Sequence, residues 1–389
     1  MSQLNTKPTV VVAGASGFVG QAIGATLSQA YTLIGLSRST RTPRNGYQSF
    51  RKTDLFSLKD CEAALEGADV AIYLVHSMMP SARLVQGNFS DLDLLCADNF
   101  ARAAKRNGVR QIVYLGGLLP ATGDLSLHLK SRAEVERALA GTGVPVTTLR
   151  AGLVVGHDGS SFQMLLRLVE RLPVMLCPAW TSTRMQPVAI RDVVAAIQRV
   201  TNQDVHFNAT YDLGCPEVVT YRELLEQTAE ALGLERLFIS VPLFSPNLSR
   251  LWVSLTTGAP KDLVGPLVKS LTHEMIARDE YLFDCIEPTP LKTMLEHAVM
   301  EAKRHRSTPR AFQKAPASTY THTVRSVQRM TIPEGTDAEW ATEQYIQWLP
   351  VGLKGLVRVR REANDIHFTL FQRGPTLLSL SLRNHRSEP

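Results

Sequence analysis

The stretch VVVAGASGFVG, residues 10–20, decides the fold of this chain. It joins an apolar, β-branched run to a helix-like segment through three glycines spaced GxxGxxG, at Gly14, Gly17 and Gly20. In a strand–turn–helix unit these glycines permit a tight turn, a close backbone approach to a diphosphate and close contact between helix and strand. Free amides and the positive dipole at the helix start favour the same ligand. The stretch therefore predicts a dinucleotide-binding turn made of Gly14, Ala15, Ser16, Gly17, Phe18, Val19 and Gly20.

Short apolar runs alternate with longer helical stretches as far as Arg150. Each run is nearly continuous in apolar residues, as expected for strands of a parallel sheet buried on both faces. The runs are Thr9–Ala13, Thr32–Leu36, Val70–Val75, Gln111–Leu115 and Val146–Leu149. The sequence therefore predicts the α/β class, with a doubly wound parallel-sheet Rossmann fold.

Beyond Arg150 the alternation weakens. With 389 residues, 44% of them apolar, the chain is long enough for one large unit and a smaller one. Residues 1–300 are expected to form the dinucleotide-binding domain, of which residues 151–300 make a substrate-side subdomain. Its predicted elements are helices over Phe162–Arg171, Arg191–Thr201 and Thr220–Leu232, the last opened by a capping box, and a strand over Val205–Leu213.

A second, smaller unit is expected at the end of the chain. Residues 301–319 are rich in Lys, Arg and Pro and poor in large apolar side chains, which predicts a linker. Residues 320–389 then predict a small α+β domain, with a helical stretch from Trp340 to Trp348. Its strand-like runs are Gly355–Arg361, Ile366–Gln372 and Thr376–Leu382.

Charge and cysteine usage exclude several classes of protein. The net charge of +6, from 42 Lys and Arg against 36 Asp and Glu, is too small to indicate a nucleic-acid partner. The five cysteines are scattered, without the spacing of a metal site or of a disulfide framework. The first residues carry no secretory signal, and no apolar run reaches about 18 residues. A cytoplasmic protein without a metal is therefore expected.

One stretch leaves two interpretations open. Leu248, Leu251, Trp252 and Leu255 recur at helical spacing with little charge around them. They could touch a membrane surface or an apolar ligand, or they could form the buried face of a helix. The buried face is favoured, so peripheral membrane contact is the lesser alternative. The oligomeric state is left open.

The end of the second apolar run indicates which dinucleotide is preferred. A cofactor without a 2′-phosphate usually meets an Asp or Glu there, which binds the ribose hydroxyls. This chain has no carboxylate at that point and instead has Ser37, Arg38 and, slightly later, Arg41. Charge-assisted bonds from Arg38, with Arg41 as a second donor, would hold a 2′-phosphate. We therefore expect NADP rather than NAD, with Ser37 and Arg38 in the site; a solvated basic loop is the alternative.

Three further stretches carry a family resemblance. They read AKRNGVRQIVYLGGL at 104–118, SLHLKSRAEVE at 126–136 and QPVAIRDV at 186–193. With the glycine motif, they resemble the atypical or extended branch of the short-chain dehydrogenase/reductase superfamily, and within it the NmrA-like NAD(P)-binding proteins. The resemblance covers most of residues 8–300. Such proteins often carry a further domain, which residues 320–389 resemble only over its beginning, so this unit is expected to be incomplete or shortened.

The resemblance also implies where the rest of the cofactor binds. It assigns the adenine to Asp54 and Leu55, and the ribose to Val75, His76 and Ser77. From the residues alone, Asp54 could equally be a turn or helix-capping residue. The segment after the fifth strand would face the nicotinamide.

The chain departs from the family at its usual catalytic residues. Ordinary members have a Ser or Thr after the strand and a YxxxK pair on the next helix. Here LGGL follows Tyr114, which is expected to be buried, and the helix reads HLKSR at 128–132. In the matching register, His128 replaces the Tyr and Arg132 replaces the Lys.

His128 and Arg132 are therefore the candidate catalytic residues. They lie one helical turn apart, on one face of the helix. An imidazole can exchange protons near neutral pH, while Arg132 could orient a cofactor hydroxyl or a carboxylate. The alternative for His128 is a structural, hydrogen-bonded role. Asp192 is expected to cap a helix or to pair with Arg191 near the cleft.

Two functions remain from the sequence. The first is an NADPH-dependent oxidoreductase acting on a small carbonyl or alkene substrate, with His128 or water supplying a proton. The second is a non-catalytic dinucleotide-binding protein, a redox sensor or an assembly scaffold, because the YxxxK pair is absent.

Overall fold

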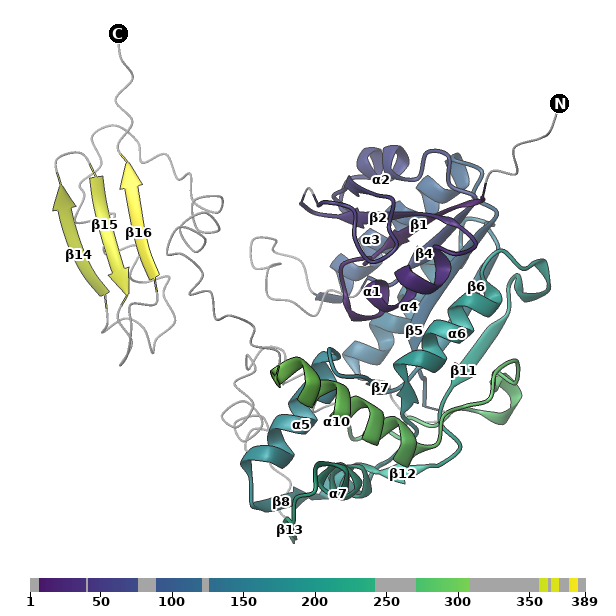
Figure 1. The fold of residues 1–389 in the computed structure, drawn as a ribbon. Helices are drawn as coiled ribbons and strands as arrows, with labels where there is room; N and C mark the ends of the chain where they lie inside the picture. The colour runs from purple at the N-terminus through teal and green to yellow at the C-terminus, as the bar shows by residue number, and fades with distance from the viewer. Residues whose placement is uncertain are drawn as a thin grey trace. The chain divides into compact units, whose positions relative to one another are not determined.

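The computed structural model describes residues 7–39, 41–75, 89–120, 126–241, 271–307, 357–362, 365–370 and 378–383. The chain divides into two compact units, Met1–Arg304 and His305–Pro389. The first unit contains the main parallel sheet and its covering helices (Figure 1).

The central sheet has seven parallel strands, which confirms the predicted doubly wound Rossmann fold. From β1 the chain moves outward to β2 and β3, then crosses back to β4 and continues in the opposite direction. This reversal creates a crevice at the carboxyl ends of β1 and β4, where such sheets bind ligands. In order across the sheet, the strands are β11 (Thr210–Leu213), β6 (Val146–Ala151), β5 (Gln111–Gly117), β4 (Val70–Tyr73), β1 (Thr9–Ala13), β2 (Thr32–Ser37) and β3 (Ser49–Lys52).

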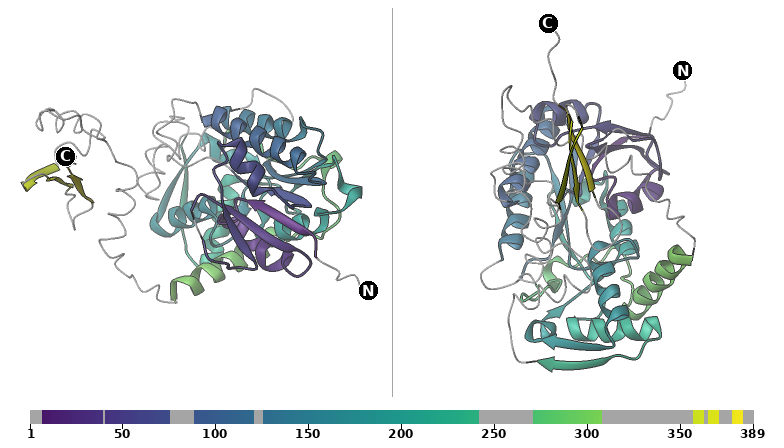
Figure 2. Two further views of the ribbon diagram at one scale, coloured as in Figure 1. Left: turned by 90° about the horizontal axis from the view of Figure 1, so that it is seen from above. Right: turned by 90° about the vertical axis from the view of Figure 1, so that its left-hand side faces the viewer.

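Helices cover both faces of this sheet (Figure 2). Successive strand side chains point to opposite faces, so Val10 and Val12 of β1 pack into one core and Val11 and Ala13 into the other. Both cores exclude water, which explains why the strands are apolar without alternation. One face is covered by α1 (Phe18–Leu27) and α6 (Ile190–Val200), and the other by α2 (Leu58–Ala64), α3 (Phe89–Arg106) and α4 (Leu127–Ala140).

A third core lies in the substrate-side subdomain. The predicted capping box at the start of α7 is present, because Thr220 and Glu223 exchange side-chain-to-backbone hydrogen bonds. The helices are α5 (Ser160–Arg171), α7 (Tyr221–Leu232) and α10 (Leu291–Ser307), with short turns η2 (Ala179–Ser182), η3 (Asp204–His206) and η4 (Asp279–Tyr281). The paired strands are β7 (Val154–Val155) with β10 (Val188–Ala189), β9 (Arg184–Met185) with β12 (Val219–Thr220), and β8 (Val174–Pro178) with β13 (Leu237–Val241).

Two predicted elements differ from the structure. The strand expected over Val205–Leu213 is wrong in its first half, where η3 precedes a turn with Asn208 at φ 59°. Val205 is 81% exposed whereas His206 is buried, and the backbone of these residues forms a turn of 3-10 helix rather than an extended strand. The linker expected from residue 301 is helical up to Ser307, because Ala302 packs into the subdomain core while Lys303 and Arg304 form the outer face of α10.

The second unit contains an antiparallel sheet of three strands in the order β14–β15–β16. Their bounds are Val357–Glu362, Asp365–Leu370 and Leu378–Arg383, close to the three predicted runs. The helix expected from Trp340 to Trp348 and the apolar stretch from Leu248 to Leu255 lie outside the described residues. Within the described part of the chain, no helix is both long and apolar enough to cross a bilayer.

Candidate functional site

The glycine turn lies at the carboxyl end of β1, in the crevice beside β4. Gly14 has φ +88°, and a Cβ on it would lie 3.1 Å from the backbone carbonyl group of Leu74, which follows β4. The Gly17 amide donates to the Gly14 carbonyl oxygen at 2.9 Å and closes the turn. Helix α1 starts at the next residue, and among the described residues no side chain caps it. Its first backbone N–H groups therefore remain available to a ligand.

Gly20 brings this helix against the turn. A Cβ at Gly20 would lie 2.3 Å from the Gly14 carbonyl oxygen and 2.7 Å from the Ala15 Cα, so only hydrogen fits there. The close contact places the uncapped helix start over the end of β1. These residues fit the diphosphate of a dinucleotide.

Phe18 links the glycine turn to the substrate-side subdomain, a contact that the sequence did not suggest. A Cβ on Gly156 would lie 2.6 Å from Phe18 Cζ, and one on Gly159 would lie 3.0 Å from Phe18 Cε1. The aromatic ring therefore packs directly against the backbone between β7 and α5. Phe18, the first residue of α1, therefore connects the glycine turn to the segment between β7 and α5.

The end of β2 brings the predicted phosphate-binding residues to the same edge of the sheet. Ser37 is the last residue of this strand and is buried, and Arg38 follows it on the surface. The Ser37 hydroxyl accepts a 2.8 Å hydrogen bond from Arg41 Nε. This bond curls the loop and brings the second arginine beside the strand end. The loop therefore concentrates positive charge next to the strand that carries the glycine turn.

The remaining cofactor candidates follow the neighbouring strands β3 and β4. Asp54 is exposed, and its Oδ1 accepts from the Phe56 amide at 3.1 Å, so it is a turn residue; the N-cap of α2 is Ser57. The Leu55 carbonyl accepts from Asn99 Nδ2 at 3.0 Å, which fixes this loop to α3. Val75 lies half-buried just after β4, whereas the predicted ribose-binding residues His76 and Ser77 lie outside the described residues.

Arg132 lies beside the carboxyl end of β5. A Cβ on Gly117 would lie 3.8 Å from Arg132 Cγ, so the arginine stem runs past this glycine. The Arg132 side chain is half-buried. His128 is in the first turn of the same helix, α4, four residues earlier; the structure describes its backbone only.

Tyr114 is buried in packing, as expected. Its side chain has no exposed surface, and its hydroxyl donates to the Arg132 carbonyl oxygen at 3.5 Å. Burial raises the pKa of Tyr114, although the nearby positive charge of Arg132 opposes that rise. The phenol therefore stays protonated near neutral pH and supports α4 rather than transferring a proton.

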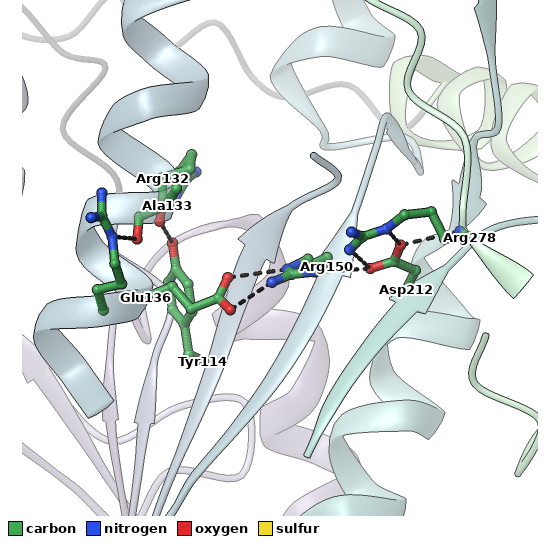
Figure 3. A network of polar contacts seen from close by, with 8 residues as sticks. Tyr114, Arg132, Ala133, Glu136, Arg150, Asp212 and Arg278 are labelled. Atoms are coloured by element: carbon green, nitrogen blue, oxygen red, sulfur yellow. Dashed lines mark hydrogen bonds and ion pairs between the residues drawn. The ribbon is translucent and has the colours of Figure 1, made fainter. Parts of the chain in front are cut away.

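A chain of charged side chains connects α4 to the carboxyl ends of β6 and β11 (Figure 3). Arg150 donates to both carboxylate oxygens of Glu136, at 3.1 Å from Nε and 2.7 Å from Nη2. Its Nη1 lies 3.7 Å from Oδ1 of Asp212, the residue opposite it on β11. Asp212, completely buried, also accepts from Arg278 Nε at 3.0 Å and from its amide at 3.1 Å. The Arg278 guanidinium stacks 4.2 Å from the centre of the Tyr281 ring.

The sequence alone did not indicate this network. Its one visible signal is Arg150, a cation inside an otherwise uncharged strand sequence, because a buried charge needs a partner. Which carboxylates supply the pairing depends on the neighbours of β6 in the sheet.

Asp192 has a structural role. Its carboxylate accepts from the Thr289 amide at 2.8 Å and from the Thr289 hydroxyl at 2.7 Å, which fixes the segment before α10. Arg191 Nε lies 3.6 Å from Asp192 Oδ1, so the expected pairing is confirmed.

Comparison with known proteins agrees with this architecture. Residues 10–120 match the model of the NAD dependent epimerase/dehydratase family. The chain is 28% identical over 113 residues to the auxiliary protein GraX of Staphylococcus aureus, a match that covers 28% of this chain and only 37% of GraX. It is 27% identical over 258 residues to sanguinarine reductase of Eschscholzia californica, covering 55% of this chain and 91% of the reductase.

A solved structure shares the fold over three quarters of the chain. The triphenylmethane reductase of Citrobacter sp., complexed with NADP(H), superposes with a TM-score of 0.58 at 20% identity, over 75% of this chain and 99% of the reductase. Both proteins have the Rossmann fold. The match of residues 10–120 to the NAD dependent epimerase/dehydratase family model agrees with the resemblance to atypical short-chain dehydrogenases/reductases.

Proposed function

We propose that this protein is an NADPH-dependent oxidoreductase that acts on a small carbonyl or alkene substrate. The observation that carries the proposal is the uncapped start of α1, seated by Gly14 and Gly20 in the crevice between β1 and β4. Sanguinarine reductase and triphenylmethane reductase, two proteins similar to this chain, are reductases by name, and the second was solved with NADP(H).

Each part of the site has a definite task in this proposal. The amides at the start of α1 bind the diphosphate, and Arg38 binds the 2′-phosphate with Arg41 beside it. When bound, NADPH supplies the hydride. Arg132 orients the reacting molecules beside Gly117, and His128 or a water provides the proton. Asp54, Leu55, Val75, His76 and Ser77 bind the adenosine and ribose portions.

Replacing Arg38 tests the choice of dinucleotide. In Arg38→Ala, NADPH binding should weaken by about 1.5 to 3 kcal/mol, the range for hydrogen bonds to charged groups, while NADH binding stays nearly unchanged. Calorimetry with both dinucleotides measures the difference. Arg44→Ala, which removes another exposed arginine downstream of β2, is the matched control and should affect neither. Equal losses for both dinucleotides in Arg38→Ala would remove Arg38 from the phosphate site.

Replacing His128 tests the catalytic half of the proposal. His128→Ala should lower kcat for NADPH oxidation by about a hundredfold, because general acid catalysis contributes at least that much, with NADPH affinity retained. Unchanged turnover would show that water supplies the proton. If the unaltered protein binds NADPH tightly but turns over no aldehyde, ketone or enone of a broad panel, the non-catalytic sensor or scaffold becomes the better assignment.

A further inference from the structure

We propose that Arg132 forms the binding site for a carboxylate of the substrate, so that the substrate class is a small carbonyl or alkene compound bearing a carboxylate. The inference rests on the proposed function and deepens it. It starts from the position of Arg132, half-buried beside Gly117 at the carboxyl end of β5. The arginine stem lies in ordinary van der Waals range of residue 117, since a Cβ there would be 3.8 Å from Arg132 Cγ.

Arg132 differs from Arg150 and Arg278 in having no ion-pair partner within the described part of the chain. Arg132 makes no ion pair with any described carboxylate. The natural partner on α4 is Glu136, one turn further along the helix. Both oxygens of Glu136 are instead engaged by Arg150, at 3.1 and 2.7 Å.

The network of Figure 3 keeps Glu136 in that arrangement. Glu136, Arg150, Asp212 and Arg278 contribute two negative and two positive charges, so the network is neutral by itself. If Glu136 moved toward Arg132, Arg150 and Arg278 would have to share the single negative charge of the buried Asp212. Glu136, Arg150 and Asp212 are therefore positioning residues, which keep the Glu136 carboxylate on Arg150 and away from Arg132.

Helix α4 adds to the positive potential at this point. No acidic residue lies in its first turn, and the N-terminal end of a helix carries a partial positive charge. A half-buried guanidinium binds well to an anion with two coplanar oxygens, because the two groups form paired hydrogen bonds. A carboxylate has that geometry.

The phosphates of the cofactor have other binding partners in the proposed site. The glycine turn is on β1 and Arg38 follows β2, whereas Arg132 lies against β5, with β4 between β5 and β1. The cofactor and the substrate are therefore the two sources of anionic groups, and the experiment separates them.

The test compares acids with their neutral esters. Pyruvate and levulinate, each against its methyl ester, and fumarate against its dimethyl ester are titrated by calorimetry into protein saturated with NADP+. At least one acid should bind about 30-fold more tightly than its ester, and Arg132→Gln should reduce that preference to within about threefold. Arg132→Lys should retain part of it. Lys130→Gln, which removes an exposed cation two residues away, is the matched control and should leave the preference intact.

Three outcomes overturn the proposal. One is that no acid binds more tightly than its ester. Another is that the preference survives Arg132→Gln. The third is that Arg132→Gln weakens NADP+ binding and leaves the acid preference, which would assign the arginine to the cofactor. Absence of NADP+ binding to the unaltered protein would instead defeat the proposed function itself, and this inference with it.

A second pair of variants tests the positioning role of the network. Arg150→Met releases Glu136, which should then pair with Arg132 and lower the acid preference about tenfold, although Arg132 is unchanged. Adding Glu136→Gln to Arg150→Met should restore the preference, a result that simple loss of structure cannot give. If Arg150→Met does not fold, Glu136→Gln alone decides: the preference should stay within about twofold, and a tenfold rise would show that Glu136 had been neutralising Arg132.

Discussion

Asp212→Asn is expected to lower the free energy of unfolding by about 3 to 5 kcal/mol, the cost of removing one partner from a buried ion pair. Asp212 has no exposed surface, and it faces two guanidinium groups, those of Arg150 and Arg278. Asparagine has nearly the same shape, so packing is preserved and only the charge is lost. The two arginines, with side chains 11% and 25% exposed, would then share the single negative charge of Glu136.

Denaturant unfolding followed by far-UV circular dichroism measures this loss. The matched control is Asp204→Asn, which removes the same charge from an ion pair with Arg110 in which both side chains are more than half exposed. That variant should change stability by less than about 1 kcal/mol, because surface ion pairs contribute little. Similar small values for both variants would show that the Asp212 network does not hold β11 and the segment of Arg278 together.

Gly20→Ala is expected to destabilise the first unit by about 3 kcal/mol and to abolish dinucleotide binding. The added methyl would overlap the Gly14 carbonyl oxygen at 2.3 Å and the Ala15 Cα at 2.7 Å. Both atoms belong to the backbone, so no side-chain rotation relieves the clash. Either α1 moves away from the turn or the turn opens, and both changes displace the amides that would hold the diphosphate.

Calorimetric titration with NADPH and thermal unfolding of the same samples measure the two effects. Gly141→Ala provides the control, since its Cβ would meet only carbonyl oxygens at 3.4 and 3.5 Å and its φ is −67°. It should bind NADPH as the unaltered protein does. Full NADPH affinity in Gly20→Ala would mean that the dinucleotide does not bind at the start of α1.

The sequence predicted the cofactor side of the candidate site, at the ends of β1 and β2, better than it predicted the contacts of the substrate-side subdomain. The glycine turn and Arg38 depend on residues adjacent in the chain, and the parallel sheet brings the ends of β1 and β2 to one edge. On the other side, the expected Arg191–Asp192 pair is present but supports Thr289, and nothing in the local sequence indicated that partner. The contact of Phe18 with Gly156 and Gly159 was likewise invisible, because it joins segments about 140 residues apart through backbone shape.

Local patterns in the sequence determined the Rossmann sheet, the glycine turn and the capping box of α7, because each depends on residues within one strand, turn or helix. The tertiary structure decided which charges meet. Asp212 lies opposite Arg150 only because β11 pairs with β6, and Glu136 reaches that arginine only because α4 packs on the adjoining strands. These distant contacts leave Arg132 without a described ion-pair partner, since the free energy of burying a charge depends on neighbours that strand order and packing supply.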